Sequence, residues 1–213
     1  MAEVARQLRK PEGAVGLERA RRMNESNRAL TEAAFATLAL DKARYLLEVG
    51  PGNAALSMPY LEAHPQLAYT GLDYAPDMVA QATELHRRWV DAGRASFVEG
   101  HAEAIPFGPQ TFDRIVTVKT LYFAANPAAV LAEYARVLQP GGRLVLAVRD
   151  AAYMRQLPFT HTGFRLYDPD ELEALFAAGP WASITFLPFT EQMRTSAAGH
   201  TGPAQSHIVV AVC

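Results

Sequence analysis

The chain has 213 residues, of which half are hydrophobic and a fifth are charged, and its formal net charge is −2. This length corresponds to one domain of ordinary size, with enough apolar material for a full core. The near-neutral charge gives no electrostatic reason to expect nucleic acid or an anionic membrane as the main partner.

Cysteine and histidine usage argues against disulfides and metal clusters. Cys213 is the one cysteine of the chain, so no intramolecular disulfide can form. His200 and His207 have no Asp, Glu or Cys at a recognisable ligand spacing, and we expect no metal site. The basic N-terminus lacks the apolar run of a secretory signal, and no stretch reaches the length of a membrane span. We therefore expect a cytoplasmic monomer or homodimer without a membrane partner.

The N-terminal segment is expected to form a helical arm. Residues 1–24 mix charged residues with proline and glycine, which predicts short helix and loop. Ser26 or Asn27 is expected to cap a helix that runs to about Leu40. Two interpretations of this arm, residues 1–40, stay open. It is either a helix packed on the domain or a lid over a ligand site.

Residues 44–55, RYLLEVGPGNAA, predict the start of a nucleotide-binding unit. The apolar run Tyr45–Val49 is typical of a strand buried on both faces, and the Gly-Pro-Gly-Asn turn ends it. Helix-forming residues resume over Ala54–Ala63. A strand, a glycine turn and a helix in this order let a ligand approach the backbone at the positive end of the helix.

The rest of the chain alternates strands with helices. Strands are predicted at residues 67–72, 94–99, 112–118 and 143–148, and helices at residues 76–93 and 126–138. This alternation indicates a parallel sheet covered on both faces. A helix over residues 168–176 is then followed by two strands at 182–189 and 207–212, without a helix between them. The sheet is therefore expected to finish as an antiparallel hairpin.

Asp73 ends the second predicted strand, about twenty residues after the glycine turn. This spacing is typical of a carboxylate that accepts hydrogen bonds from a ribose diol. The alternative is an aspartate that only caps the next turn. The glycine turn and the carboxylate together favour a nucleoside site, without selecting the nucleoside.

Four segments in order resemble the class I S-adenosylmethionine-dependent methyltransferases, in particular the bacterial group that includes the ubiquinone/menaquinone-type C-methyltransferases. They cover about residues 44–148 and read LLEVGPGNA, YTGLDYAPDMVAQA, GHAEAIPFGPQTFDRIV and LAEYARVLQPGGRLVLAV. The resemblance implies an α/β fold, a Rossmann-like three-layer sandwich. Its sheet would have seven mostly parallel strands in the order 3-2-1-4-5-7-6, with strand 7 antiparallel. The N-terminal helical arm would occupy residues 1–40 and the methyltransferase domain residues 41–213.

The resemblance also implies S-adenosylmethionine as cofactor, with S-adenosylhomocysteine as product. Its methionine end would be held at the glycine turn, its ribose by a carboxylate and its adenine by the loops that follow. The implied residues are Glu48, Gly50, Pro51, Gly52, Asn53, Asp73, Tyr74, Met78, His101, Ala102, Glu103 and Lys119. Two positions depart from the family pattern. Ala54 replaces a third glycine, and His101 replaces an aspartate, where a neutral imidazole still accepts one hydrogen bond or else points to solvent.

Methyl transfer from a sulfonium is an in-line displacement, so the protein mainly positions the acceptor and excludes water. The candidate catalytic residues are Lys119, Tyr122 and His161, with His161 as the preferred general base, and Tyr153 follows the fifth strand. The expected acceptor is a small molecule. Two other functions stay open: an NAD(P)-dependent oxidoreductase, and a module that binds S-adenosylmethionine or a nucleoside without catalysis.

Overall fold

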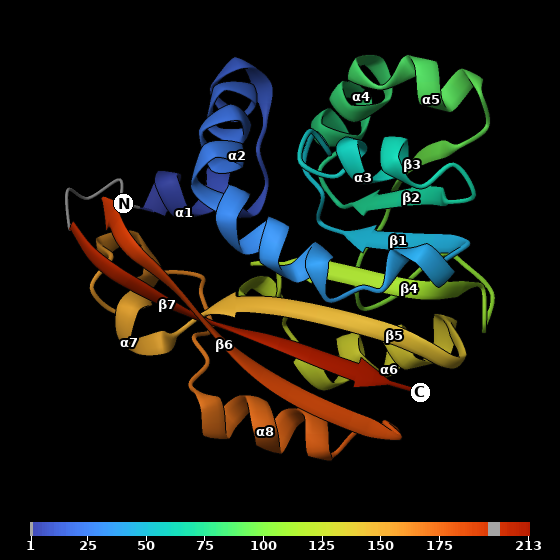
Figure 1. The fold of residues 1–213 in the computed structure, drawn as a ribbon. Coiled ribbons are helices and arrows are strands. Elements are labelled where there is room, and N and C mark those ends of the chain that lie inside the picture. The colour runs from blue at the N-terminus through green and yellow to red at the C-terminus, as the bar shows by residue number, and fades with distance from the viewer. Residues whose placement is uncertain (1, 196–200) are drawn as a thin grey trace.

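Seven strands form one sheet in the computed structural model, which describes residues 2–195 and 201–213 (Figure 1). The strands lie in the order β3-β2-β1-β4-β5-β7-β6, and β7 is antiparallel to both β5 and β6. The predicted sheet order and the terminal hairpin are therefore confirmed. The strands are β1 (Tyr45–Val49), β2 (Ala68–Asp73), β3 (Ala95–Glu99), β4 (Phe112–Val118), β5 (Leu138–Arg149), β6 (Ser183–Thr195) and β7 (Thr201–Val212).

Helices cover both faces of this sheet. One face carries α2 (Gly13–Ala36), α3 (Met58–Ala63), α4 (Pro76–Leu85) and α5 (Arg87–Asp91), and the other carries α6 (Pro127–Val137) and α8 (Pro169–Ala177). The remaining elements are α1 (Ala2–Arg9), α7 (Ala151–Met154) and the short 3₁₀ turns η1 (Leu40–Lys42), η2 (Leu121–Phe123) and η3 (Pro158–His161). No helix within the described residues is long and apolar enough to cross a membrane.

The strand period of two divides the core between the two faces. Leu46 of β1 packs with Leu30 and Phe35 of α2, whereas its neighbour Leu47 packs in the cluster that contains Tyr134 of α6. All five side chains are at most 2% exposed. Both faces of the central strand are thus buried, as the apolar run predicts.

The register of the sheet sets the place of the functional site. Val49 at the end of β1 pairs with Leu72 of β2 and with Thr117 of β4. The carboxyl ends of these parallel strands therefore meet at one edge. The glycine turn after β1, Asp73 at the end of β2 and Lys119 after β4 all emerge there.

The prediction for the arm is wrong in its helix bounds. The long helix α2 begins at Gly13 and ends at Ala36, so Ser26 and Asn27 lie inside it instead of capping it. A Cβ on Gly16 would lie 2.6 Å from the backbone carbonyl carbon of Pro11. Glycine here lets the turn between α1 and α2 pack against the helix, and a local pattern cannot show this role.

Several other bounds also differ from prediction. The helix expected over residues 54–63 begins at Met58, because Ala54 has a φ of 55° and still belongs to the glycine turn. The helix expected over residues 76–93 breaks at His86, whose Nε2 donates to the carbonyl oxygen of Asn53 at 2.8 Å. The fifth strand continues through the Pro-Gly-Gly turn, and both hairpin strands extend further than expected.

Candidate functional site

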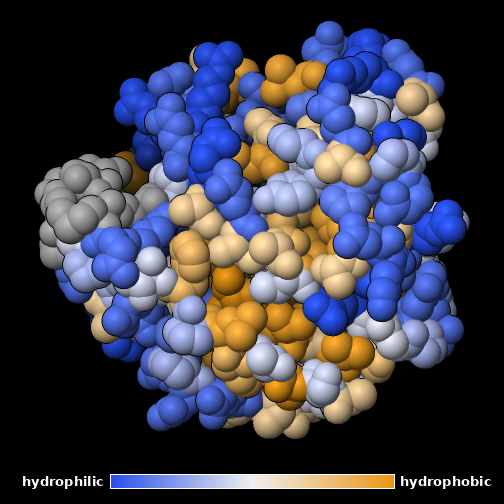
Figure 2. Space-filling model, in the orientation of Figure 1, coloured by the Kyte–Doolittle hydropathy of each residue, from blue (hydrophilic) through white to orange (hydrophobic). Residues whose placement is uncertain are grey.

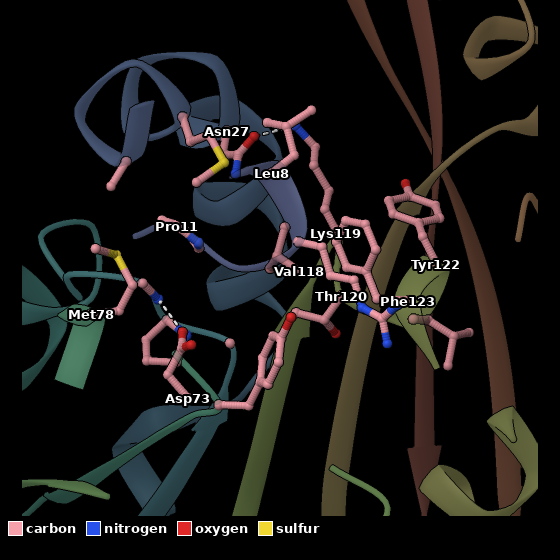
Figure 3. A pocket seen from close by; sticks show the side chains of 18 of the residues that line it. Leu8, Pro11, Asn27, Asp73, Met78, Val118, Lys119, Thr120, Tyr122 and Phe123 are labelled. Carbon is pink, nitrogen blue, oxygen red and sulfur yellow. Dashed lines mark hydrogen bonds between the residues drawn. The ribbon is translucent and has the colours of Figure 1, made fainter. Parts of the chain in front are cut away.

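A cavity of about 810 Å³ lies at the carboxyl edge of the sheet. Its walls come from the glycine turn, the loops after β2, β3 and β4, the segment containing α7 and η3, and the arm. Figure 3 shows Asp73 and Met78 on one side of it and Tyr122 and Phe123 on the other, with Leu8 and Asn27 of the arm above. The edge that the sequence indicates therefore contains a space large enough for ligands.

The glycine turn gives a ligand access to the backbone. Gly50 and Gly52 have φ angles of 74° and 58°, a conformation that glycine adopts without strain. A Cβ on Gly50 would lie 2.3 Å from Cγ2 of Thr120, whereas a Cβ on Gly52 would meet nothing within 4 Å. Gly50 is thus required for packing, and Gly52 leaves open space on the cavity side.

Asp73 is held by two backbone groups at the floor of the cavity. Its Oδ2 accepts from Gly52 N at 3.0 Å, and its Oδ1 accepts from Ala75 N at 2.9 Å. Burial raises the pKa of Asp73 to about 6, although the backbone hydrogen bonds oppose this shift. Each oxygen still has a lone pair available, so a carboxylate fixed in this way suits a pair of ligand hydroxyls.

The side chains beside Asp73 in the cavity wall are mainly apolar or aromatic. Met78 is completely buried, and the rings of Tyr74 and His101 lie with centroids 5.3 Å apart at 47°. Ala102 and Glu103 also line the cavity, and Glu103 Oε1 accepts from Asn126 N at 2.8 Å. The imidazole of His101 is exposed. The structure thus brings together in one part of the cavity wall the residues at which the resemblance implies adenine.

Glu48 is the one expected cofactor residue that does not line the cavity. It is 6% exposed, and its Oε2 accepts from Ser57 Oγ and from Tyr69 OH at 2.7 Å. Burial raises the pKa of Glu48 to about 7. Its carboxylate thus links β1 to Tyr69 of β2 and to Ser57, which precedes α3.

The three candidate catalytic residues have different positions. Lys119 lines the cavity with a φ of 61°, and its Nζ donates to Asn27 Oδ1 at 2.6 Å and to Ser26 O at 3.2 Å. Tyr122 also lines the cavity, and its hydroxyl accepts from the backbone N–H of Arg149. His161 is exposed at the end of η3 and does not line the cavity.

The arm contacts the site at three hydrogen-bonded points. Gly13 N donates to Asp77 Oδ2 at 2.7 Å, Asn24 Nδ2 donates to Asn53 Oδ1 at 2.9 Å, and Asn27 accepts from Lys119. Figure 2 shows that the outer surface of the arm is largely hydrophilic. Because α1 and the first half of α2 line the cavity, they form part of its cover.

Arg149 and Phe164 are among the lining residues that no motif of the sequence singles out, although the segment 150–168, which contains Phe164, is expected to help form the acceptor pocket. Arg149, which is 3% exposed, follows the apolar run of the fifth strand, and a charge at the end of such a run was the available signal. Phe164 lies in a segment without a motif, so its place depends on loop packing. Among described residues, no group of three or more His, Cys, Asp or Glu is arranged to hold a metal, and His200 lies outside the described residues.

Comparisons with known proteins indicate a methyltransferase domain. A family described as "Methyltransferase domain" matches residues 47–146. Erythromycin 3''-O-methyltransferase of Saccharopolyspora erythraea is 33% identical over 65% of this chain and 42% of that protein. Demethylmenaquinone methyltransferase of Deinococcus radiodurans is 30% identical over 76% of this chain and 66% of that protein. The chain thus spans about half the length of the curated relatives it matches.

Solved structures show the same fold at lower identity. A chain from the complex between the Haloferax volcanii Trm112 methyltransferase activator and a methyltransferase superposes with a TM-score of 0.72. The match covers 92% of this chain and 93% of that chain at 20% identity. At this identity the likeness shows the fold alone.

Proposed function

The chain belongs to the class I S-adenosylmethionine-dependent methyltransferases, and from that membership we propose that it transfers a methyl group from S-adenosylmethionine to a small-molecule acceptor. Both molecules would occupy the one cavity, with the cofactor at Asp73 and the acceptor toward Tyr122. The cofactor supplies a methyl group already activated by a sulfonium. The residues of this chain would bind the cofactor, orient the acceptor toward its methyl group and exclude water.

The observation that carries the proposal is the fixed carboxylate of Asp73. Its two backbone hydrogen bonds hold both oxygens in place, and the open space at Gly52 lies directly beside it. A ribose diol matches two acceptors in this arrangement. Tyr74 and Met78 then lie beside the adenine, and Gly50, Pro51, Gly52 and Asn53 surround the amino-acid end. Glu48 acts as a positioning residue through its hydrogen bond from Ser57.

The acceptor side suits positioning better than proton abstraction. Burial raises the pKa of Tyr122 well above its ordinary value, so its hydroxyl stays protonated and can donate to an acceptor oxygen. Lys119 directs its ammonium to the arm. His161 has no place in this proposal, because it is exposed outside the cavity. The chain would therefore work chiefly by proximity and by exclusion of water.

We also propose that the start of the arm is a lid. Four hydrogen bonds join α2 to Asp77, Asn53 and Lys119, which lie at the cofactor end of the cavity. A segment that covers a cavity while tied by a few polar contacts can open for ligand exchange. The second half of α2 packs in the core, so we propose the lid role only for the part of the arm before it.

Family membership argues against the NAD(P)-dependent oxidoreductase, and two measurements test what remains. Calorimetry with S-adenosylhomocysteine and with NADH should give binding of the first alone. Incubation with methyl-labelled S-adenosylmethionine and a fractionated bacterial small-molecule extract should label at least one fraction. Binding of NADH alone would refute the proposal. Binding of S-adenosylhomocysteine without labelling of any fraction would favour the non-catalytic module.

A further inference from the structure

The acceptor end of the cavity has a chemistry of its own. We call it the apolar chamber and define it by Leu8, Tyr122, Phe123, Met154, Phe159 and Phe164, all of which line the cavity. The chamber lies between η2, α7, η3 and α1, and α1 contacts η3 directly. Single-ligand pockets begin at roughly 300 Å³. A cavity of about 810 Å³ therefore has room for the cofactor and a second molecule.

Phe164 is the centre of an aromatic cluster in this chamber. Its ring centroid lies 4.8 Å from that of Phe123, 5.9 Å from that of Tyr122 and 5.9 Å from that of Phe159. Phe123, Phe159 and Phe164 are each only partly buried, so part of each ring faces the cavity or solvent. Aromatic faces and edges exposed to a cavity favour a flat ring as their partner, because ring pairs add to the energy of burial.

The charge at the base of the chamber is already balanced. Arg149 donates to the carboxylate of Glu191, and the two side chains are 4% and 11% exposed. Its guanidinium also lies 5.4 Å from the ring centroid of Tyr153 and 3.4 Å from Ser206 Oγ. A carboxylate on the acceptor would compete with Glu191 for Arg149, and an ammonium would be repelled by the guanidinium. An ion buried without a new partner is costly.

We propose that the methyl acceptor is a neutral, largely apolar molecule with an aromatic ring, and that Phe164 is a specificity-determining residue for it. This inference rests on the proposed function, because it assigns the remainder of the cofactor cavity to the acceptor. The apolar chamber would select uncharged aromatic compounds over aromatic acids and amines of the same size. The ring stacks in the aromatic cluster, and Tyr122 donates a hydrogen bond to its polar substituent.

Binding of matched probes tests the inference without turnover. We would titrate 2-naphthol and 2-naphthoate at pH 7 into the full chain saturated with S-adenosylhomocysteine, using calorimetry. The two probes share a ring system, and only the second is charged at this pH. We expect 2-naphthol to bind at least about tenfold more tightly, because Arg149 at the base of the chamber is already paired with Glu191 and the carboxylate would have to displace that partner. Equal or tighter binding of 2-naphthoate, or no binding of either probe, would overturn the inference.

Two variants locate the binding in the chamber. Phe164→Leu keeps an apolar side chain and removes the ring, and we expect 2-naphthol to bind about fivefold more weakly. Phe186→Leu is the matched control, because Phe186 is also partly buried but packs on Phe176 of α8, away from the cavity. Both variants should keep the wild-type affinity for S-adenosylhomocysteine.

The outcomes separate this inference from the proposed function. An unchanged affinity of Phe164→Leu for 2-naphthol, with S-adenosylhomocysteine still bound, would refute the role of Phe164 alone. Failure of the wild-type chain to bind S-adenosylhomocysteine would instead refute the proposed function. If Phe164→Leu does not fold, Phe159→Leu provides a second test, since its ring belongs to the same cluster.

Discussion

Glu48→Gln removes a buried charge while it keeps the shape of the side chain. Both hydrogen bonds to Glu48, from Ser57 Oγ and Tyr69 OH, end on the same carboxylate oxygen, Oε2. A glutamine can place its carbonyl oxygen at this position and accept both. The substitution therefore isolates the effect of the charge on stability and on cofactor binding.

The size of the effect follows from the pKa. Burial raises the pKa of Glu48 from 4.5 to about 7, against the two hydrogen bonds that lower it. The folded protein thus binds this proton more tightly than the unfolded chain does. The free energy of unfolding therefore falls as the pH rises from 4.5 to about 7. Above pH 7 the contribution of Glu48 to this free energy stays constant. At about 1.4 kcal/mol per pH unit, the ionised carboxylate costs the folded protein roughly 3 kcal/mol.

Urea unfolding of the ligand-free protein measures this cost. We expect Glu48→Gln and wild type to be about equally stable near pH 4, where Glu48 is largely protonated in both states, and the variant to be roughly 2–3 kcal/mol more stable near pH 8.5. Burial raises the pKa of Asp73 to about 6 as well, so the wild-type curve contains both groups and the difference between the proteins isolates Glu48. Glu62→Gln is the control, because the Glu62 side chain is 63% exposed, and we expect a change within about 0.5 kcal/mol.

Two results would refute this reasoning. The first is a Glu48→Gln variant that is less stable than wild type near pH 8.5. The second is a stability difference that does not shrink as the pH falls toward 4. Titration of the same variant with S-adenosylhomocysteine gives the role in binding. An affinity within about twofold of wild type is expected of a positioning residue, and a loss of more than about tenfold would mean direct contact with the cofactor.

Three further predictions concern the cofactor site and its cover. Asp73→Ala removes the acceptor assigned to the ribose, and affinity for S-adenosylhomocysteine in calorimetry should fall by about 1–3 kcal/mol; unchanged affinity in a folded variant would place the ribose elsewhere. Asn27→Ala removes a partner of Lys119 Nζ, and trypsin should cleave the arm faster while the thermal midpoint changes by only a few degrees; cleavage at the wild-type rate would count against the tie. Deletion of residues 1–24 should leave cooperative unfolding intact and slow methyl transfer, and a deletion that abolishes folding would favour a packing role for the whole arm.

The parts of the fold that were predicted correctly are those fixed by local sequence. The run before the glycine turn is apolar at consecutive positions, and this suffices to indicate a strand buried on both faces. Asp73 follows the next such run, so a parallel arrangement brings it to the same edge as the turn. The geometry of the arm and of the glycine turn depends instead on contacts that a local sequence pattern does not show. Position 16 of α2 needs a glycine because Pro11 packs against it. Ala54 has a positive φ because it completes the glycine turn.

The acceptor side could not be predicted from residue types alone. His161 follows the fifth strand and has suitable chemistry, but adjacent residues in a loop can point in opposite directions. Thr160, the residue before it, is 4% exposed and donates to Met154 O at 2.8 Å, and His161 is left in solvent. Phe164, three residues after His161, lines the cavity instead. Side-chain direction in this segment comes from tertiary packing, which no period in the sequence encodes.

The division of α2 between core and cavity cover limits how the proposed lid can move. Leu30 and Phe35 are at most 2% exposed under the sheet, so the helix cannot swing away as a rigid rod without opening the core. Opening of the proposed lid would instead bend or unwind α2 near Asn27, where the contacts with the main sheet cluster end and the Lys119 hydrogen bond begins. At about 1 kcal/mol each, the four hydrogen bonds of Gly13, Asn24, Ser26 and Asn27 would hold the proposed lid closed, which corresponds to an open population of roughly 0.1%. The apolar contacts of Met78 with the arm lower it further. Cofactor exchange would then be limited by opening of the lid, and loss of the arm should speed the uptake of S-adenosylhomocysteine even as it slows methyl transfer.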